Sequence, residues 1–158
     1  MTIDADAFRS ALGRFASGVT VVTTCASDGT DQGMTASAFC SVSLEPPLIL
    51  ICVEHTGSVY EPMANATTFT VNILSEGQEA LARRFAGPDP DRFEGLGFSR
   101  GGNGNAIFSE VLGYLQCKVV AKHPTGDHDI LVAEVEEAMA DEGRPLLYYR
   151  GGYAQLER

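Results

Sequence analysis

The sequence is poor in positive charge and contains no long apolar run. It has 11 lysines and arginines against 21 aspartates and glutamates, a formal net charge of −10. Nucleic acids and anionic membranes are bound by basic faces, so we expect neither as a partner. No apolar run reaches the roughly 18 residues of a membrane span. Residues 1–12 are acidic and amphipathic, which is not typical of a signal peptide. We therefore expect a cytoplasmic protein.

Cysteine frameworks, metal-ligand patterns and standard catalytic signatures are also missing. Cys25, Cys40, Cys52 and Cys117 lie far apart without a C-x-x-C pair, and we interpret them as reduced thiols in or near the core. The three histidines have no carboxylate or cysteine at metal-ligand spacing, so we expect no metal. There is no nucleophile elbow, Walker loop or H-E-x-x-H pair. Gly101–Gly104 neither follows a clear strand nor opens a helix, which argues against a phosphate loop.

The chain has the size and composition of one globular domain. It has 158 residues, of which 44% are hydrophobic and 20% charged, values typical of a protein with a sizeable core. It contains no internal repeat, low-complexity segment or linker. We therefore expect a single domain over residues 1–158.

Short apolar runs separated by turn residues indicate a mainly β protein. We expect strands at residues 19–25, 33–43, 48–53, 68–74, 111–122, 128–139 and 146–149, and helices at 4–16, 59–63 and 75–85. The glycine-rich segment 92–110 is expected to be a long loop packed over the rest of the fold. The strands follow one another too closely for a parallel α/β sheet. An antiparallel barrel or sandwich of six or seven strands, with two or three short helices, fits better.

The most informative stretch is Gly33–Val53. Its first half carries small and hydroxylated side chains, and after the turn at Glu45–Pro47 its second half is almost purely apolar. A strand with small side chains leaves its backbone groups reachable, so a flat ligand with a polar edge, such as a flavin ring, could lie against it. A serine- and alanine-rich strand packed closely on a neighbour is an equally good interpretation at this point.

Three other local patterns allow both a binding role and a structural one. His128 follows Asp127 at a turn, where it is either a ligand-facing imidazole or a solvated turn histidine. Arg83–Phe85 closes a helix, where cations favour the helix dipole, although one arginine could instead bind a phosphate. Tyr148–Tyr153 combines aromatic rings, a cation and glycines, which suits either edge-strand packing or an aromatic ligand.

Seven segments, in order along nearly the whole chain, resemble the short-chain flavin reductase family. These segments are Phe15–Thr23, Gly33–Ser37, Ser41–Leu48, Phe69–Leu74, Arg84–Ala86, Gly126–His128 and Pro145–Tyr153. The family comprises the reductase components of two-component flavin-dependent monooxygenases. The resemblance implies a mainly β (α+β) fold, a Greek-key FMN-binding split barrel that assembles as a homodimer.

The resemblance also implies which residues meet the ligands. The flavin, FMN or FAD, is expected against Met34, Thr35, Ala36, Ser37, Ser41, Val42 and Ser43, with Val53, Glu54, His55, Ser58, Arg84 and Phe85 around its ribityl-phosphate end. The nicotinamide is expected near His128, Tyr149, Arg150, Gly151, Gly152 and Tyr153, with His128 as the catalytic residue. Family members often carry lysine, arginine or asparagine near position 55. The pair Glu54–His55 therefore predicts weaker phosphate binding than in those family members.

The implied activity is NAD(P)H-dependent flavin reduction. NADH or NADPH transfers a hydride from C4 of its nicotinamide to flavin N5, and the reduced flavin diffuses to a separate monooxygenase. Positioning supplies most of this catalysis, which is consistent with the missing general base. Two alternatives are a non-catalytic flavin carrier and a split-barrel oxidase of a phosphorylated pyridoxine. The oxidase would need several cations near Gly33–Val53, where the sequence offers few.

Overall fold

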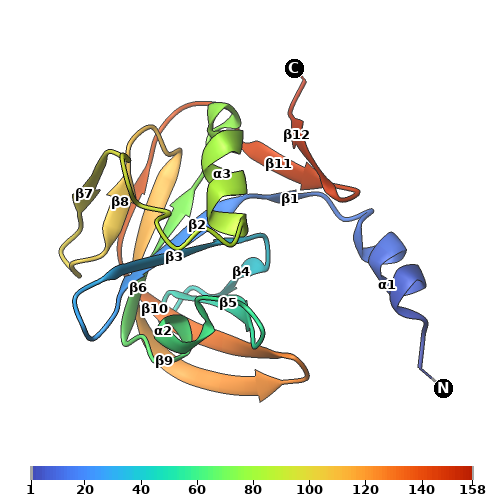
Figure 1. The fold of residues 1–158 in the computed structure, drawn as a ribbon, viewed down its shortest axis with the longest axis horizontal. Coiled ribbons are helices and arrows are strands. Elements are labelled where there is room, and N and C mark those ends of the chain that lie inside the picture. Colours follow the sequence, from blue (N-terminus) through green and yellow to red (C-terminus); the bar gives the residue numbers. More distant parts are fainter. Residues whose placement is uncertain (1, 158) are drawn as a thin grey trace.

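A seven-stranded antiparallel sheet forms the centre of the molecule, as seen in a computed structural model that describes residues 2–157 (Figure 1). Its strands are β2 (Thr20–Cys25), β3 (Asp31–Ala36), β4 (Phe39–Ser43), β5 (Leu48–Glu54), β6 (Thr68–Ile73), β9 (Gly113–Thr125) and β10 (His128–Ala140). They lie in the order β3-β2-β6-β9-β10-β5-β4. The expected mainly β, antiparallel architecture is therefore confirmed.

The sheet curls until its two edge strands come close without pairing. Strands β3 and β4 occupy opposite ends of the strand order, yet only Ser37 and Ala38 separate them in sequence. Strand β3 pairs with β2, with Thr20 opposite Ala36, whereas β4 pairs with β5. The expected single extended stretch before the proline turn is thus two strands that belong to opposite edges. The barrel remains split at the Ser37–Ala38 link.

Tight turns set the register of the hairpins. At the β2–β3 turn, Gly29 has a φ of 84°, and the Asp28 carboxylate accepts a hydrogen bond from the Thr30 amide at 3.0 Å. This is an Asp-Gly turn, whose second residue needs the left-handed conformation that glycine adopts readily. Between β9 and β10, Gly126 has a φ of 65°. That turn brings His128 directly opposite Glu54 of β5.

Helix α3 (Glu79–Ala86) covers one side of the barrel and packs on β3. A capping box precedes it: the Ser75 amide donates to the Gln78 side chain at 2.9 Å, at the start of the 3₁₀ turn η1 (Glu76–Gln78). The Phe85 ring lies against Gly33, where an added Cβ would be 2.7 Å from the ring. The glycine in β3 therefore lets the helix approach the strand closely. The second short helix, α2, covers Tyr60–Ala64.

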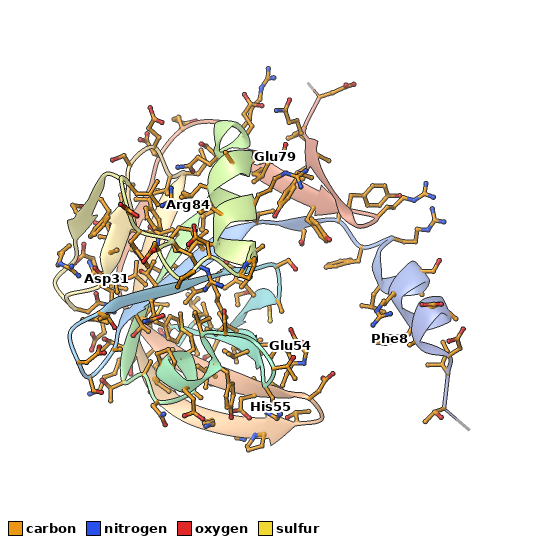
Figure 2. All side chains as sticks on the ribbon, in the orientation of Figure 1. Phe8, Asp31, Glu54, His55, Glu79 and Arg84 are labelled. Carbon is orange, nitrogen blue, oxygen red and sulfur yellow. The ribbon has the colours of Figure 1, made fainter. Side chains whose placement is uncertain are left out.

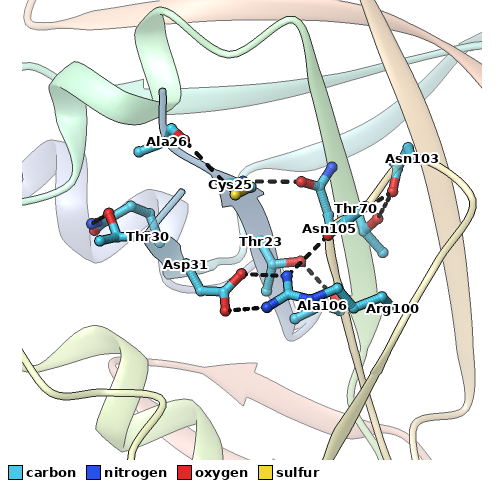
Figure 3. A network of polar contacts seen from close by, with 12 residues as sticks. Thr23, Cys25, Ala26, Thr30, Asp31, Thr70, Arg100, Asn103, Asn105 and Ala106 are labelled. Atoms are coloured by element: carbon cyan, nitrogen blue, oxygen red, sulfur yellow. Dashed lines mark hydrogen bonds and ion pairs between the residues drawn. The ribbon is translucent and has the colours of Figure 1, made fainter. Parts of the chain in front are cut away.

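The segment expected to be a loop, residues 92–110, contains a short hairpin. Its strands are β7 (Phe98–Arg100) and β8 (Ala106–Phe108), and Gly101–Gly104 lie in the turn between them. Polar contacts tie this hairpin to β2 and β3 (Figure 3). Arg100 forms a two-pronged ion pair with Asp31 at 2.7 and 2.8 Å, and the Asn105 side chain accepts from the Cys25 amide at 2.9 Å. Tertiary contacts of this kind stabilise strands too short to be recognised from periodicity.

A separate three-stranded sheet joins the two ends of the fold. It consists of β1 (Ser17–Gly18), β11 (Leu146–Tyr149) and β12 (Gly152–Gln155). Strand β12 was not expected. The turn between β11 and β12 places Arg150 and Gly151 at φ values of 53° and 79°. The Arg150 amide donates to the Gly13 carbonyl at 2.9 Å, which fixes the hairpin against the chain that follows the first helix.

The N-terminal helix α1 (Ala5–Leu12) is shorter than the expected 4–16 and stands apart from the barrel (Figure 1). Asp4 caps its start as predicted, but Gly13 ends it, with the Gly13 amide donating to the Arg9 carbonyl at 2.8 Å. None of the residues Ala5–Leu12 is buried in the described chain. The side chain of Phe15, expected on the apolar face of this helix, is 80% exposed.

Two apolar clusters make up the core. The first fills the barrel interior with residues such as Ile51, Phe69 and Leu131. The second lies between the sheet and α3 and includes Phe85 and Phe108, packed edge to face at 5.2 Å. Phe93 and Phe98 extend this second cluster, as expected for a segment that packs over the fold. Among residues 2–157, no helix is both long and apolar enough to cross a bilayer.

Candidate functional site

A cavity of about 570 Å³ opens beside the split of the barrel, between β3 and β5, and is within the size range of small-molecule sites. We call it the β3–β5 cavity. Its lining comes from the end of β3, the link to β4, the end of β5 with its following loop, α2, the end of α3 with its following loop, and the start of β10. The lining residues are Met34–Ala38, Cys52–Glu54, Thr56–Tyr60, Phe85–Pro88, Arg92 and His128.

One wall of the cavity consists of small side chains at the place where the barrel is open. Ser37 and Ala38 lie between the β3 and β4 ladders, and both are exposed. The hydroxyl of Thr35 donates to the Ala82 carbonyl at 2.6 Å, so this side chain anchors α3 to the wall. The Ser37 and Ala38 carbonyls accept from the Phe39 and Cys52 amides at 2.9 and 3.1 Å, so a planar ligand at the link would meet small side chains and backbone N–H groups.

Arg92 supplies the fixed positive charge of the cavity, and sequence analysis missed it. Its side chain is 7% exposed and donates to the Gly33 carbonyl at 3.1 Å, to the Ser58 hydroxyl at 2.8 Å and to the Gly87 carbonyl. These bonds hold the segment after α3 against β3 on one side and against the loop after β5 on the other. The signal in the sequence is weak, because Arg92 lies in a segment without periodicity and far from the strands it joins.

Arg84, expected at the phosphate end, does not line the cavity. Its guanidinium donates to the carbonyls of Asp91 at 3.0 Å and Glu94 at 2.5 Å. Figure 2 shows Arg84 beside α3 and Glu54 beside β5, on different parts of the molecule. The helix end turns Phe85 toward the cavity and Arg84 toward the loop that carries Arg92. Arg84 therefore shapes the cavity through that loop.

His55, also expected at the phosphate end, faces a buried carboxylate instead. The Asp129 side chain is 1% exposed and contacts His55 Nε2 at 2.9 Å, the Tyr60 hydroxyl at 2.8 Å and Lys122 Nζ at 3.1 Å. The hydrogen bond from His55 is the largest influence that lowers the pKa of Asp129, to about 2. The same cluster raises the pKa of Tyr60, chiefly through its hydrogen bond to Asp129. This cluster fixes Tyr60, which lines the cavity.

His128 and Glu54 meet at the rim, on paired strands. His128 is opposite Glu54 in the β5–β10 register, and both residues line the cavity. Asp127 contacts His128 Nδ1 at 2.7 Å, and this contact lowers the pKa of the Asp127 carboxyl. The Glu54 carboxylate accepts from the Thr56 hydroxyl at 3.0 Å. Because Asp127 occupies Nδ1, Nε2 is the ring nitrogen left to contact a bound molecule.

Several expected site residues lie outside the cavity lining. Ser41 and Val42 are exposed on the edge strand β4, and Ser43 is half-buried at its end. Tyr149 is exposed and points away, because alternation along β11 directs Tyr148 inward instead. Tyr148 and Tyr153 pack edge to face at 5.5 Å around a side slot of about 200 Å³, which shares Thr35 and Ser37 with the β3–β5 cavity.

The remaining residues of the β11–β12 turn border two further hollows. Arg150 and Gly151 line an apolar groove beside α1, whereas Gly151, Gly152 and Tyr153 line a shallow pocket beside Arg83. The Arg83 guanidinium lies 4.9 Å from the centre of the Tyr153 ring. The β11–β12 turn is therefore a neighbour of the cavity rather than part of its lining.

The donor set of the cavity fits a flavin. Backbone N–H groups beside the small side chains of Ser37 and Ala38 suit the heteroatoms along one edge of an isoalloxazine ring. At the other end, the Ser58 hydroxyl and Arg92 suit a phosphate, which guanidinium groups bind well. Within residues 2–157, no group of three or more His, Cys, Asp or Glu side chains is placed to hold a metal ion.

The fold and the cavity together define a split β-barrel protein whose cavity suits a flat, phosphate-bearing ligand. The chain matches the family profile described as flavin reductase like domain over residues 12–157. It therefore belongs to this family, and the suspected resemblance is confirmed.

Named relatives carry related activities. The chain is 42% identical over 153 residues to an NADH-dependent flavin reductase of Rhodococcus sp., covering 94% of this chain and 85% of that protein. It is 43% identical over 152 residues to the reductase component of 4-hydroxyphenylacetate 3-monooxygenase of Thermus thermophilus, covering 96% of both. The solved NADH:FAD oxidoreductase SgcE6 of Streptomyces globisporus, in complex with NAD and FAD fragments, superposes with a TM-score of 0.91 at 33% identity, covering 99% of this chain and 97% of that one.

Proposed function

We propose that this protein is an NAD(P)H-dependent flavin reductase that delivers reduced flavin to a separate monooxygenase. The observation that carries the proposal is the β3–β5 cavity, whose small-residue wall and single buried arginine fit a flavin in a chain of the flavin reductase family. The activity is supported by the 42% identity to an NADH-dependent flavin reductase. The partner is supported by relatives named as reductase components of monooxygenases. When bound, FMN or FAD supplies the redox chemistry by accepting two electrons from the nicotinamide.

In this proposal the cavity lining binds and orients the flavin. The proposed contacts are Met34, Thr35, Ala36 and Ser37 at the ring, and Val53, Glu54, Ser58, Phe85 and Arg92 toward the ribityl phosphate. Phe85 and Val53 are buried and exclude water from one side. His55 and Arg84 act indirectly, by holding Tyr60 and the segment that carries Arg92.

His128 and the β11–β12 turn are proposed to receive the nicotinamide nucleotide. His128 reaches the cavity from β10, and Asp127 fixes its ring through Nδ1. Its free Nε2 then orients the substrate so that the reacting atoms are held in contact. Tyr153, Gly152, Gly151 and Arg150 border the adjacent hollows, with Tyr148 in place of Tyr149 on the inward side.

Anaerobic absorbance spectroscopy tests the activity. The purified protein, with FMN or FAD in excess, is mixed with NADH and in parallel with NADPH, and the flavin absorbance is followed. We expect the flavin to bleach over many turnovers with at least one of the two nucleotides. If flavin binds but neither nucleotide reduces it, the protein is a flavin carrier. If no flavin binds, the cavity assignment is wrong.

We further propose that the protein acts as a homodimer in the cytoplasm and that residues 1–158 form one domain. An isolated helix as short as α1 is only marginally stable in water, and the apolar side chains of Phe8, Leu12 and Phe15 are all more than half exposed. A second copy of the chain is proposed to cover them. The groove beside α1, lined by Leu12, Phe15, Phe39 and Leu50, is the matching surface. A reducing compartment suits the four free cysteines.

A further inference from the structure

We propose that Glu54 sets the flavin specificity of the site by offsetting the attraction of Arg92 for a phosphate. On this proposal the protein binds riboflavin and FMN with similar affinity. The inference rests on the proposed function, in that it takes the flavin to lie in the β3–β5 cavity. It goes further by naming the balance of charges because of which the flavin phosphate contributes little to the binding affinity.

The charges that face the cavity are few and nearly balanced. Of the lining residues, only Arg92, Glu54 and His128 carry side chains that are charged, or can be, near neutral pH. Arg92 and Glu54 have opposite unit charges. His128 has the Asp127 carboxylate at 2.7 Å. An incoming phosphate therefore meets little net positive charge.

The Arg92 side chain is not free to reorient toward a bound phosphate. Its Nε and both terminal nitrogens already donate to the Gly33 and Gly87 carbonyls and to the Ser58 hydroxyl, and the side chain is almost fully buried. Breaking these bonds would leave buried backbone carbonyls without partners, which is costly. Arg92 therefore acts on a phosphate as a charge fixed in position.

Two cations next to lining residues make other contacts. Lys122 pairs with the buried Asp129 at 3.1 Å, and Arg84 donates to the Asp91 and Glu94 carbonyls. Neither residue lines the cavity in the described chain. No second arginine or lysine of residues 2–157 is thus positioned to tip the balance in favour of phosphate.

Glu54 and Arg92 line the same cavity, so a phosphate bound there is exposed to both charges. Glu54 ends β5, and the loop that follows it leads to Ser58, whose hydroxyl is bonded to Arg92. The Glu54 carboxylate accepts from the Thr56 hydroxyl at 3.0 Å, and the Gly57 amide donates to the Glu54 carbonyl at 3.2 Å. The carboxylate therefore lies at the solvent-exposed rim of the cavity. A phosphate monoester carries about −2 charge at neutral pH, so it is repelled more than a neutral flavin.

The test compares flavins that differ in phosphate charge. Dissociation constants for riboflavin, FMN and FAD are measured by flavin fluorescence, without NADH, for the wild type and for Glu54→Gln. We expect wild-type constants for riboflavin and FMN within about threefold of each other. In Glu54→Gln, FMN should bind about three- to tenfold more tightly, as expected for removing one unit charge at a solvent-facing rim. Riboflavin affinity should not change.

Salt and a matched substitution serve as controls. The gain for FMN should shrink in about 0.5 M salt, because screening weakens charge interactions at this range. Glu61→Gln removes an equal charge from α2 outside the cavity lining and should leave all three constants unchanged. A wild-type preference for FMN over riboflavin of more than about tenfold would overturn the proposal. So would an equal shift of riboflavin and FMN in Glu54→Gln, or no shift at all.

The proposed function and the proposed role of Glu54 are tested by different outcomes. If NADH reduces the flavin but the constants show no dependence on charge at position 54, only the role of Glu54 is lost. If no flavin binds to the wild type, the cavity assignment and the role of Glu54 fall together.

Discussion

At the residue scale, His128 is the side chain on which the nicotinamide proposal depends. It lines the cavity, and Asp127 fixes its ring. We expect His128→Ala to slow flavin reduction about 10- to 100-fold, because the substrate is no longer held in position, with flavin affinity unchanged. Stopped-flow reduction at varied NADH separates a rise in KM from a fall in kcat. Asp127→Ala should give a smaller loss of the same kind. Wild-type kinetics in His128→Ala would exclude His128 from the site.

The buried carboxylate of Asp129 couples the stability of the barrel end to pH. Its pKa is about 2 in the folded protein, chiefly because of the hydrogen bond from His55, and about 3.9 in an unfolded chain. An acid with a lowered pKa stabilises the fold above its unfolded pKa, and this contribution disappears as pH falls through the folded pKa. We expect Asp129→Asn to unfold at a lower temperature at neutral pH. The difference in unfolding temperature between the variant and the wild type should narrow between about pH 4 and pH 2.

Thermal unfolding followed by circular dichroism at several pH values measures this gap. Glu45→Gln is a suitable control, because Glu45 is an exposed turn carboxylate at the end of β5 opposite to the end that pairs with Asp129. A gap between wild type and Asp129→Asn that stays constant down to pH 2 would show that the ionised carboxylate is not the stabilising form.

Arg92 and Arg84 provide a matched pair for the phosphate end. Both bond to carbonyls of the loop after α3, but only Arg92 lines the cavity. We expect Arg92→Ala to weaken FMN binding relative to riboflavin and to cost about 2–3 kcal/mol of unfolding free energy, since buried charged hydrogen bonds are lost. Arg84→Ala should loosen the same loop without changing the FMN-to-riboflavin ratio. If the ratio of FMN affinity to riboflavin affinity is the same in both variants, Arg92 does not act on the phosphate.

This pair also shows how far the sequence predicts the site. Chemical type and local pattern pointed to the small-residue wall around Ser37 and to the histidine of the hairpin turn, and both line the cavity. They pointed to Arg84 at the helix end and missed Arg92, because which arginine lines the cavity depends on which side of the helix end faces β3. That orientation is set by the contact of Phe85 with Gly33, which is a long-range contact.

At the element scale, the β3–α3 contact fixes the position of the cavity wall. An added Cβ at Gly33 would lie 2.7 Å from the Phe85 ring and 3.3 Å from Phe93. We expect Gly33→Ala to cost about 1–3 kcal/mol by overpacking and to weaken flavin binding as α3 moves away. Gly77→Ala, in η1, meets no atom within 4 Å and should change stability by less than about 0.5 kcal/mol. Urea unfolding of both variants measures the difference, and equal stabilities would contradict the packing argument.

Elements with strong periodicity or explicit turn chemistry were predictable from sequence, and short paired strands were not. The hairpin β9–β10 and the Asp28–Gly29 turn follow from alternation and turn residues. Strands β7, β8 and β12 have three or four residues each, too few for a periodic signal. They exist because of tertiary contacts such as the pair formed by Arg100 and Asp31. The split of one extended stretch into β3 and β4 likewise reflects barrel closure, which no local pattern encodes.

At the scale of the whole molecule, the exposed helix α1 is the feature that a single copy of the chain does not explain. Its apolar face was predicted from spacing, but the burial of that face was not found within residues 2–157. The same surface continues over the groove lined by Phe39, Cys40 and Leu50, which shares Ser37, Ala38 and Cys52 with the β3–β5 cavity. A second copy seated there would therefore also close the open side of the flavin site.

This arrangement predicts that dimer formation and flavin binding are linked. The wild type is expected to sediment at twice the mass of one chain. Leu12→Asp places a charge on the apolar face of α1, where the side chain is 55% exposed, and should give a monomer with weaker flavin binding. Val120→Asp, at a 51% exposed position of β9, should leave both properties unchanged. Sedimentation velocity with flavin titration distinguishes the outcomes. A monomeric wild type would contradict the homodimer, and a Leu12→Asp monomer with full flavin affinity would show that the site is complete within one chain.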